Sequence, residues 1–291
     1  MNRLFKAAFT LIELLVVIAI IGILSGLIVV TMNGVTAKAT IAKAQVFSNS
    51  LRNALMMNLV SEWKFDSDAS DSWGDNEGTS FGSPIYKSSS ECISGQCLSF
   101  DGTDDYVNIP DSSSWTFGTG GFSINFWVKL NEASPASRKP IISGGPVYTS
   151  DSDTFSFYQS DGGKWEISLL TTNKGWASGS ASDITNWHNI TIVRESGIND
   201  FYVFLDGVRL SGTVLSGGWG IASVNFNWNV VNFGRSWDSG KFKGLIDDAR
   251  IFNAAMPTSQ VKEQYYVGLN NLFANGEITR EEYLEKIVGI K

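Results

Sequence analysis

Hydrophobic residues follow different spacings in successive parts of the chain. The first stretch, from Phe9 to Met32, is apolar at almost every position and contains one charged residue, Glu13. Up to Leu59, apolar residues then recur at steps of three and four, the spacing of an amphipathic helix; they are Ile41, Ala44, Phe47, Leu51 and Leu55. We therefore predict one long helix over residues 9–59, apolar all round at first and amphipathic afterwards, whose second half packs on the folded domain.

From Val60 onward the spacing changes to two. Residues 122–130 alternate Phe, Ile, Phe, Val and Leu with Ser, Asn, Trp and Lys, and residues 186–195 and 201–210 alternate in a similar way. Asp206-Gly207 is a strong signal for a two-residue hairpin turn. Many short strands separated by turn residues, with no helices between them, indicate an antiparallel β-sandwich.

The last part of the chain returns to a helical pattern. A helix beginning at Pro257 is expected to run through Tyr265, Gly276 suits a helix C-terminus, and Thr279 with Glu282 makes a capping box for a following helix. The sequence thus predicts a short helical tail, to which it assigns no function.

The N-terminal apolar run is long enough to cross a membrane, because a helix rises about 1.5 Å per residue and the hydrocarbon core is about 30 Å thick. Arg3 and Lys6 precede it without any acid, so the N-terminus is expected in the cytoplasm and everything after Met32 outside. A secretory signal peptide has a shorter apolar region. A plain membrane anchor has no need of Glu13, because a carboxylate in an apolar helix costs about 2.5–3.5 kcal/mol.

Residues 8–22 resemble the N-terminal segment of type IV prepilins and pseudopilins. The resemblance implies a leader peptide, residues 1–8, that prepilin peptidase cuts between Ala8 and Phe9, after which Phe9 is N-methylated. Ala8 departs from the glycine that is usual in the family. Glu13 becomes the fifth mature residue, which in the family pairs with the N-terminus of a neighbouring pilin subunit, so its expected role is assembly.

Residues 60–266 resemble the concanavalin A-like jelly roll of the laminin-G-like type. The most specific matching stretches are SFDGTDDYV, residues 99–107, and GLIDDARIFNAAM, residues 244–256. The expected fold is therefore mainly β: an antiparallel jelly-roll sandwich preceded by a long pilin-like helix and followed by a short helical appendage, residues 267–291.

Composition limits the partners and the chemistry. The chain has 291 residues and a formal net charge of −7, with no basic cluster after the anchor, so we expect no nucleic acid partner. Its two cysteines, Cys92 and Cys97, are close together in an exported domain and are expected to form a local disulfide; free thiols are the alternative.

The sequence favours a binding module over an enzyme. A retaining glycosidase needs two carboxylates about 5–5.5 Å apart, but Glu166 stands alone in its predicted strand and no other catalytic set is visible. We therefore expect no catalytic residues. Sugar rings stack on exposed aromatic faces, and four tryptophans lie in Gly-, Ser- and Asn-rich stretches that are typical of loops or strand ends; these candidate ligand-binding residues are Trp176, Trp219, Trp228 and Trp237. Trp63, Trp127 and Trp187 are expected in the core instead.

We expect that no cofactor is required. If the domain binds an ion, calcium is expected, because the chain is rich in the hard oxygen ligands that calcium prefers. Related jelly rolls hold calcium with an acid near the first strand and groups near the last, which implies Asp66 and Asp248 as ligands. Solvated acids in turns are the alternative.

Taken together, these patterns predict a pilin-like subunit, anchored in the membrane as a precursor and displayed at the cell surface after assembly. Its jelly roll is expected to bind a glycan or a surface protein in adhesion. The alternatives are a structural minor pilin or secretion pseudopilin without a ligand, and a polysaccharide-active enzyme.

Overall fold

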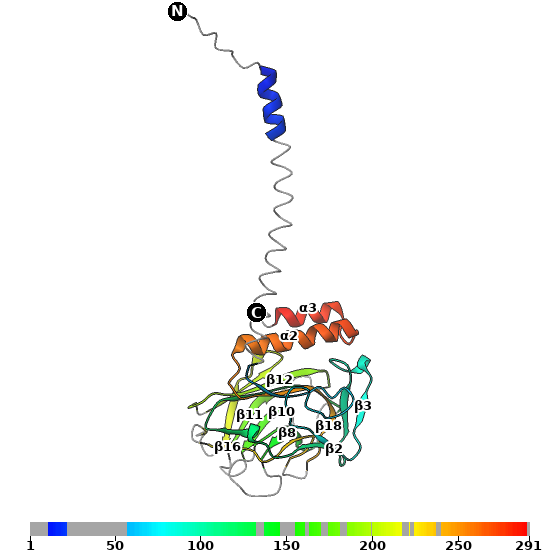
Figure 1. Ribbon diagram of the computed structural model, residues 1–291, viewed down its shortest axis with the longest axis vertical. Helices are drawn as coiled ribbons and strands as arrows, with labels where there is room; N and C mark the ends of the chain where they lie inside the picture. The colour runs from blue at the N-terminus through cyan, green and yellow to red at the C-terminus, as the bar shows by residue number, and fades with distance from the viewer. Residues whose placement is uncertain are drawn as a thin grey trace, which may run out of the picture. The chain divides into compact units, whose positions relative to one another are not determined.

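The computed structural model describes residues 11–21, 57–131, 137–145, 155–160, 163–169, 174–180, 185–198, 200–216, 221, 224–236 and 240–289. The chain divides into two units, Met1–Asn53 and Ala54–Lys291. In the first unit, residues 11–21 form a helix. The second unit holds all the strands and the two C-terminal helices (Figure 1).

Two antiparallel sheets, which we name sheet A and sheet B, form a sandwich in the second unit. Sheet A has eight strands, in the order β14 (Val208–Arg209), β13 (Phe201–Leu205), β12 (His188–Arg194), β7 (Phe122–Leu130), β18 (Lys243–Phe252), β4 (Cys97–Asp101) and β3 (Ile85–Lys87), with β1 (Leu59–Trp63) also paired to β18. Sheet B has eight strands, in the order β15 (Gly212–Ser216), β11 (Lys174–Ser180), β10 (Lys164–Leu169), β9 (Phe155–Gln159), β8 (Lys139–Gly144), β17 (Val231–Phe233), β5 (Tyr106–Ile109) and β2 (Thr79–Phe81).

Smaller elements complete the domain. β6 (Thr116–Gly118) pairs with β16 (Phe226–Asn227), and short 3₁₀ helices cover Ser89–Glu91 and Ser113–Trp115. The expected mainly β sandwich with helical ends is confirmed.

The core lies between the sheets and follows the predicted alternation. In β7, Phe122, Ile124 and Phe126 belong to the main apolar cluster, whereas Trp127 belongs to a second cluster on the outer face of sheet A. The Asp206-Gly207 turn joins β13 to β14, with Leu205 opposite Val208, as predicted.

Helix α2 (Thr258–Asn275) covers the outer face of sheet A, and α3 (Arg280–Val288) packs beside it (Figure 1). Tyr265 of α2 stacks on Trp127 with ring centroids 5.7 Å apart. Gly268 brings the helix still closer, because a Cβ there would lie 2.3 Å from the same indole. Helices α2 and α3 are therefore part of the domain's packing.

Two predicted boundaries need correction. Helix α2 continues to Asn275, ten residues past the predicted end at Tyr265, because Leu269 and Leu272 extend its buried face. The long N-terminal helix does not reach Leu59, since Leu59 begins β1 and pairs with Phe252. Gly276 and the Thr279 capping box end and begin the helices as predicted. The expected packing of residues 41–55 lies outside the described residues.

Candidate functional site

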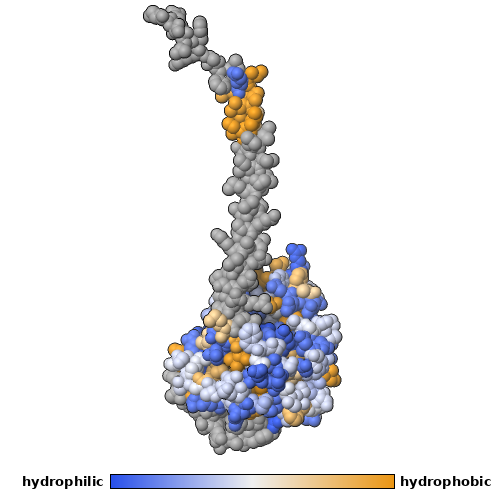
Figure 2. Space-filling view, in the orientation of Figure 1, coloured by the Kyte–Doolittle hydropathy of each residue, from blue (hydrophilic) through white to orange (hydrophobic). Residues whose placement is uncertain are grey.

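The described part of the N-terminal segment is an apolar helix whose side chains are exposed within the chain. Residues 11–21 are all exposed; the exposed fractions of their large apolar side chains run from 80% for Leu11 to 45% for Val17, and Figure 2 shows a largely apolar surface there. Glu13 lies in this helix, whereas Ala8 and Phe9 lie outside the described residues. Among the described residues, no helix is both long and apolar enough to cross a membrane. So much exposed apolar surface on one helix needs a cover.

The predicted exposure of the candidate tryptophans is wrong for the two that the structure describes. Trp176 is 3% exposed and Trp228 is 2% exposed, and both belong to the main core cluster. Trp228 packs among Phe117, Phe122 and Phe155. Trp219 and Trp237 lie outside the described residues.

As predicted, the strand tryptophans are structural. Trp63 and Trp127 are 0% and 1% exposed, and Trp187, which is 5% exposed, donates its indole N–H to the carbonyl of Glu91 at 3.0 Å.

An exposed aromatic pair lies on the rim of sheet B instead. Phe81 of β2 is 42% exposed and stacks on Tyr106 of β5, with ring centroids 4.7 Å apart and planes 7° apart. Arg235 and Lys241 lie over the same Tyr106 ring, at 4.4 Å and 5.9 Å from its centroid. We name Phe81, Tyr106, Arg235 and Lys241 the aromatic rim. It offers a flat apolar face beside two cations, an arrangement suited to polyhydroxylated ligands.

The sequence alone does not reveal the aromatic rim, although it carries one signal of it. In residues 106–109, Val107 and Ile109 alternate with Tyr106 and Asn108, and the two aliphatic residues are core residues. Period two therefore places Tyr106 on the outer face. Nothing in the sequence brings Phe81 beside it, because that contact depends on the pairing of β2 with β5.

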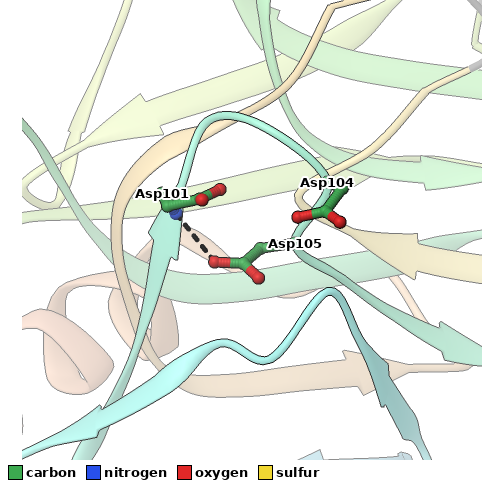
Figure 3. Close-up of side chains that lie close together, drawn as sticks. All are labelled: Asp101, Asp104 and Asp105. Carbon is green, nitrogen blue, oxygen red and sulfur yellow. Dashed lines mark hydrogen bonds between the residues drawn. The ribbon is translucent and has the colours of Figure 1, made fainter.

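An acidic turn adjoins the aromatic rim between β4 and β5. The carboxylates of Asp101, Asp104 and Asp105 lie within 4.8 Å of one another (Figure 3), and the backbone N–H of Asp101 donates to Asp105 at 2.9 Å. Burial, together with the charges of Asp101 and Asp104, raises the pKa of Asp105 despite that hydrogen bond. The N–H of Thr103 holds the pKa of Asp101 below its usual range. This is the one group of three acids in the described part of the chain with metal-ligand spacing.

The predicted calcium ligands Asp66 and Asp248 lie elsewhere and already have protein partners. Asp66 accepts the N–H of Gln96 at 2.8 Å, and Asp248 lies 3.5 Å from the guanidinium of Arg250. Burial raises the pKa of Asp248, with Asp66 among the charges that add to the effect and Arg250 opposing it. The cation beside Asp248 is thus Arg250. Calcium stays a prediction.

The predicted disulfide is formed, with Cys92 and Cys97 Sγ atoms 2.05 Å apart. Asp247, which is 0% exposed, contacts the loop between the two cysteines. It accepts the N–H groups of Ile93 at 2.8 Å and Ser94 at 3.1 Å. Its other oxygen has no partner in the described part of the chain. Burial and the neighbouring Asp248 raise the pKa of Asp247 well above its usual value.

A row of small polar residues crosses the outer face of sheet B. The strand registers bring one small residue from each of seven adjacent strands into line, and six of the seven are polar: Thr79, Asn108, Asn232, Ser143, Ser156, Ser168 and Gly175. The middle of the row is covered, because Ser143 donates to the carbonyl of Arg235 and Ser156 bonds to Ser236, both at 2.9 Å. The exposed end of the row, at Thr79, leads towards the aromatic rim.

Glu166 lies beside this row but without a second acid opposite it. Its cross-strand neighbours are Tyr158 and Ala177, and it is 8% exposed. As predicted, then, no second acid pairs with Glu166 on the adjacent strands.

Comparisons with solved structures find a similar sandwich in an arabinanase domain and in two toxin structures. Domain 4 of an extracellular arabinanase from Geobacillus stearothermophilus, solved with arabinotriose, has a TM-score of 0.54 and 20% identity over 71% of this chain and 97% of that one. A botulinum neurotoxin type C structure, described by its interaction with two ganglioside molecules, has a TM-score of 0.59 and 13% identity over 75% of this chain and 53% of that one. The binding domain of Paraclostridial Mosquitocidal Protein 1 has a TM-score of 0.60 and 14% identity, over 74% and 53%. This chain thus spans about half of the two toxin chains, and identities this low establish the fold alone.

Family comparisons match both parts of the sequence. No curated protein matches the chain. Residues 4–29 match the prokaryotic N-terminal methylation motif, and residues 101–262 match the concanavalin A-like lectin/glucanases superfamily. The chain therefore belongs to the concanavalin A-like lectin/glucanases superfamily and carries, at its N-terminus, the methylation motif of type IV pilin-like proteins.

Proposed function

We propose that this protein is a type IV pilin-like subunit that presents a carbohydrate-binding β-sandwich at the cell surface for adhesion. The observation that carries the proposal is the presence of both parts in one chain, a methylation motif at residues 4–29 and a lectin/glucanase-type domain at residues 101–262. The exposed apolar helix supports the first part, since it needs lipid or neighbouring helices as a cover. Glu13 then pairs with the N-terminal amine of a neighbouring subunit, and prepilin peptidase processes the chain at Ala8.

Support for a glycan ligand comes from the aromatic rim and from the structural neighbours. Phe81 and Tyr106 form a stacked pair with an exposed face. Two of the neighbouring structures are described with glycan ligands, an arabinotriose and gangliosides. We place the adhesive contact at the aromatic rim, where a sugar ring stacks on Phe81.

We also propose that the domain is not an enzyme. Hydrolysis with retention needs two carboxylates about 5–5.5 Å apart across the scissile bond. Glu166 faces Tyr158 and Ala177 on the adjacent strands, so no acid lies directly across from it. Release of reducing sugar from a polysaccharide by the purified protein would contradict this proposal.

A glycan array probed with the full chain in detergent tests the ligand proposal. We expect binding that is weakened in Phe81→Ala and in Tyr106→Ala. Phe273→Ala is the matched control, because Phe273 is also 42% exposed and stacks on a tyrosine, Tyr283, at 4.9 Å. Absence of binding to any glycan would favour a structural minor pilin or pseudopilin.

The assembly proposal has a separate test. Glu13→Ala should abolish incorporation into filaments while the β-sandwich stays folded, which immunogold microscopy and circular dichroism would report. Glu13→Asp, which keeps the charge, should retain part of the incorporation. Normal filaments from the alanine variant would refute the role given to Glu13.

A further inference from the structure

A pocket remote in sequence from the aromatic rim lies where the chain crosses from sheet A to sheet B. It has a volume of about 340 Å³, and the crossing residues Arg209 to Gly212 form one of its walls. Trp176 of β11, Phe201 at the start of β13 and Asp200 just before it complete the pocket. We name it the edge pocket. Its volume is near the lower end of the range for small-molecule sites, about 300–1,000 Å³, and suits one small ring.

The edge pocket contains one cation and one anion that do not neutralise each other. Arg209 lies over the ring of Tyr202, 3.8 Å from its centroid, and within the described residues no carboxylate is within ion-pair distance of it. Asp200 uses one oxygen to accept the N–H of Phe201 at 2.9 Å. Its second oxygen forms no hydrogen bond with the described residues. Arg209 thus offers several N–H donors and Asp200 an acceptor in the same pocket.

Part of the wall around these two groups is packed into the core. Gly212 lies flat against Trp176, since a Cβ at residue 212 would be 2.0 Å from the indole. Trp176 and Phe201 are core residues, 3% and 1% exposed. The Arg209 side chain is exposed and lies over the Tyr202 ring, and the backbone of Arg209 pairs with Phe204. A rigid site loses less entropy when it binds, which favours a small ligand with few contacts.

We propose that the edge pocket binds a single neutral sugar residue through two adjacent hydroxyl groups, one accepting from Arg209 and the other donating to Asp200. A hydroxyl both donates and accepts, so a pair of them satisfies an arginine and a carboxylate at once. An anionic ligand would pair with Arg209 but would bring its charge beside Asp200, and the pocket's two charges sum to zero. The proposal rests on the proposed function for its ligand class, and it adds a second sugar site separate from the aromatic rim.

The test compares the full chain in detergent with Arg209→Gln and Asp200→Asn, using isothermal titration calorimetry. The probes are methyl β-D-galactopyranoside, its monodeoxy analogues, arabinotriose and sodium glucuronate. Each substitution should weaken binding of the neutral probes about tenfold or more, because a site that bonds a hydroxyl discriminates strongly once the partner is lost. Arg138→Gln is the matched control, since Arg138 also lies over a tyrosine, Tyr158 at 4.8 Å, and is not among the residues of the edge pocket.

Double-mutant logic links the hydroxyls to the residues. Some deoxy analogues should bind the wild type more weakly than the parent sugar does. In the variant that lacks the matching partner, such an analogue and the parent sugar should bind equally. Phe81→Ala should leave binding of methyl galactoside unchanged while it lowers binding on the glycan array.

The outcomes separate the two proposals. Neutral sugars that bind the wild type and both edge-pocket variants equally would overturn the edge pocket and leave the proposed function standing. Glucuronate that binds as tightly as the neutral probes would overturn the neutral-sugar assignment. A wild-type chain that binds none of the probes and no glycan on the array would overturn the proposed function and the edge pocket with it.

Discussion

Asp71 is predicted to hold the loop after β1 in place, and Asp71→Ala tests this. The carboxylate is 7% exposed and accepts four backbone N–H groups. Its Oδ1 accepts from Glu62 at 2.9 Å, Trp73 at 3.0 Å and Gly74 at 2.9 Å, and its Oδ2 accepts from Asn76 at 3.1 Å. Alanine leaves all four donors without their acceptor.

The expected loss follows from these contacts. A hydrogen bond to a charged group contributes about 1.5–3 kcal/mol, but water and local relaxation recover part of a shared set, so we expect a loss of about 3–4 kcal/mol in the free energy of unfolding. For a domain of this size the unfolding midpoint should fall by about 2–4 °C per kcal/mol, or about 10 °C in all.

The loss should also depend on pH with a definite sign. Burial raises the pKa of Asp71, but the N–H groups of Gly74, Glu62 and Trp73 outweigh it, so the folded-state pKa lies below the usual value. A carboxyl with a lowered pKa stabilises the fold above its unfolded pKa of about 3.9 and loses that contribution as pH falls through the folded pKa. The gap between wild type and Asp71→Ala should therefore be full at about pH 7 and should narrow below about pH 4.

Urea unfolding of the full chain in detergent, followed by tryptophan fluorescence, measures both effects. Asp75→Ala is the matched control, because Asp75 is an exposed acid in the same loop. A loss for Asp71→Ala within about 0.5 kcal/mol of the control would refute the reasoning, as would a gap that stays constant below pH 4.

Two further substitutions have predictable effects on stability. Asp247 has a raised folded-state pKa, so its contribution is complete below the unfolded value of about 3.9 and is lost as pH rises through the folded pKa. Asp247→Asn should therefore lose less stability than the wild type as the pH rises above about 4. The free energy of unfolding, measured with urea at several pH values, reports this. An equal dependence of that free energy on pH in the two proteins would contradict the prediction. Gly268→Val should cost about 1–3 kcal/mol because its Cβ would meet Trp127, whereas Gly289→Ala, whose Cβ comes no closer than 3.6 Å to another atom, should cost little. Equal urea midpoints for the two glycine variants would show that α2 does not pack tightly on sheet A.

The strands could be predicted from the sequence where one face of the sheet is core and the other is not. Residues 122–130 show this, because Ile124 and Phe126 face sheet B and Trp127 faces α2. The order of the strands could not be predicted from that pattern alone. The resemblance implied the type of sandwich, a concanavalin A-like jelly roll, and the match over residues 101–262 confirms that family.

The glycine-rich surroundings of Trp176 and Trp228 do not indicate exposed loops, because both tryptophans are buried. Glycine is common in loops, but it also lets an indole approach a backbone closely. Gly144 lies against Trp228, where a Cβ would be 2.2 Å from the ring, and Gly212 lies in the same way against Trp176. Both glycines are far from their tryptophan in sequence, so no local signal separates a packed indole from an exposed one.

The disulfide loop explains why the predicted boundary at Tyr266 does not separate a domain from an appendage. Asp247 of β18 holds the N–H groups of Ile93 and Ser94 from one side. The side-chain amide of Asn275, at the end of α2, donates to the carbonyls of Cys92 and Ile93, both at 3.3 Å, from the other. A chain that ended at Tyr266 would lose this second set of contacts and would uncover the apolar surface around Trp127. Helix α2 and the sandwich should therefore unfold together in hydrogen exchange, and earlier exchange of α2 would show that the two are separate units.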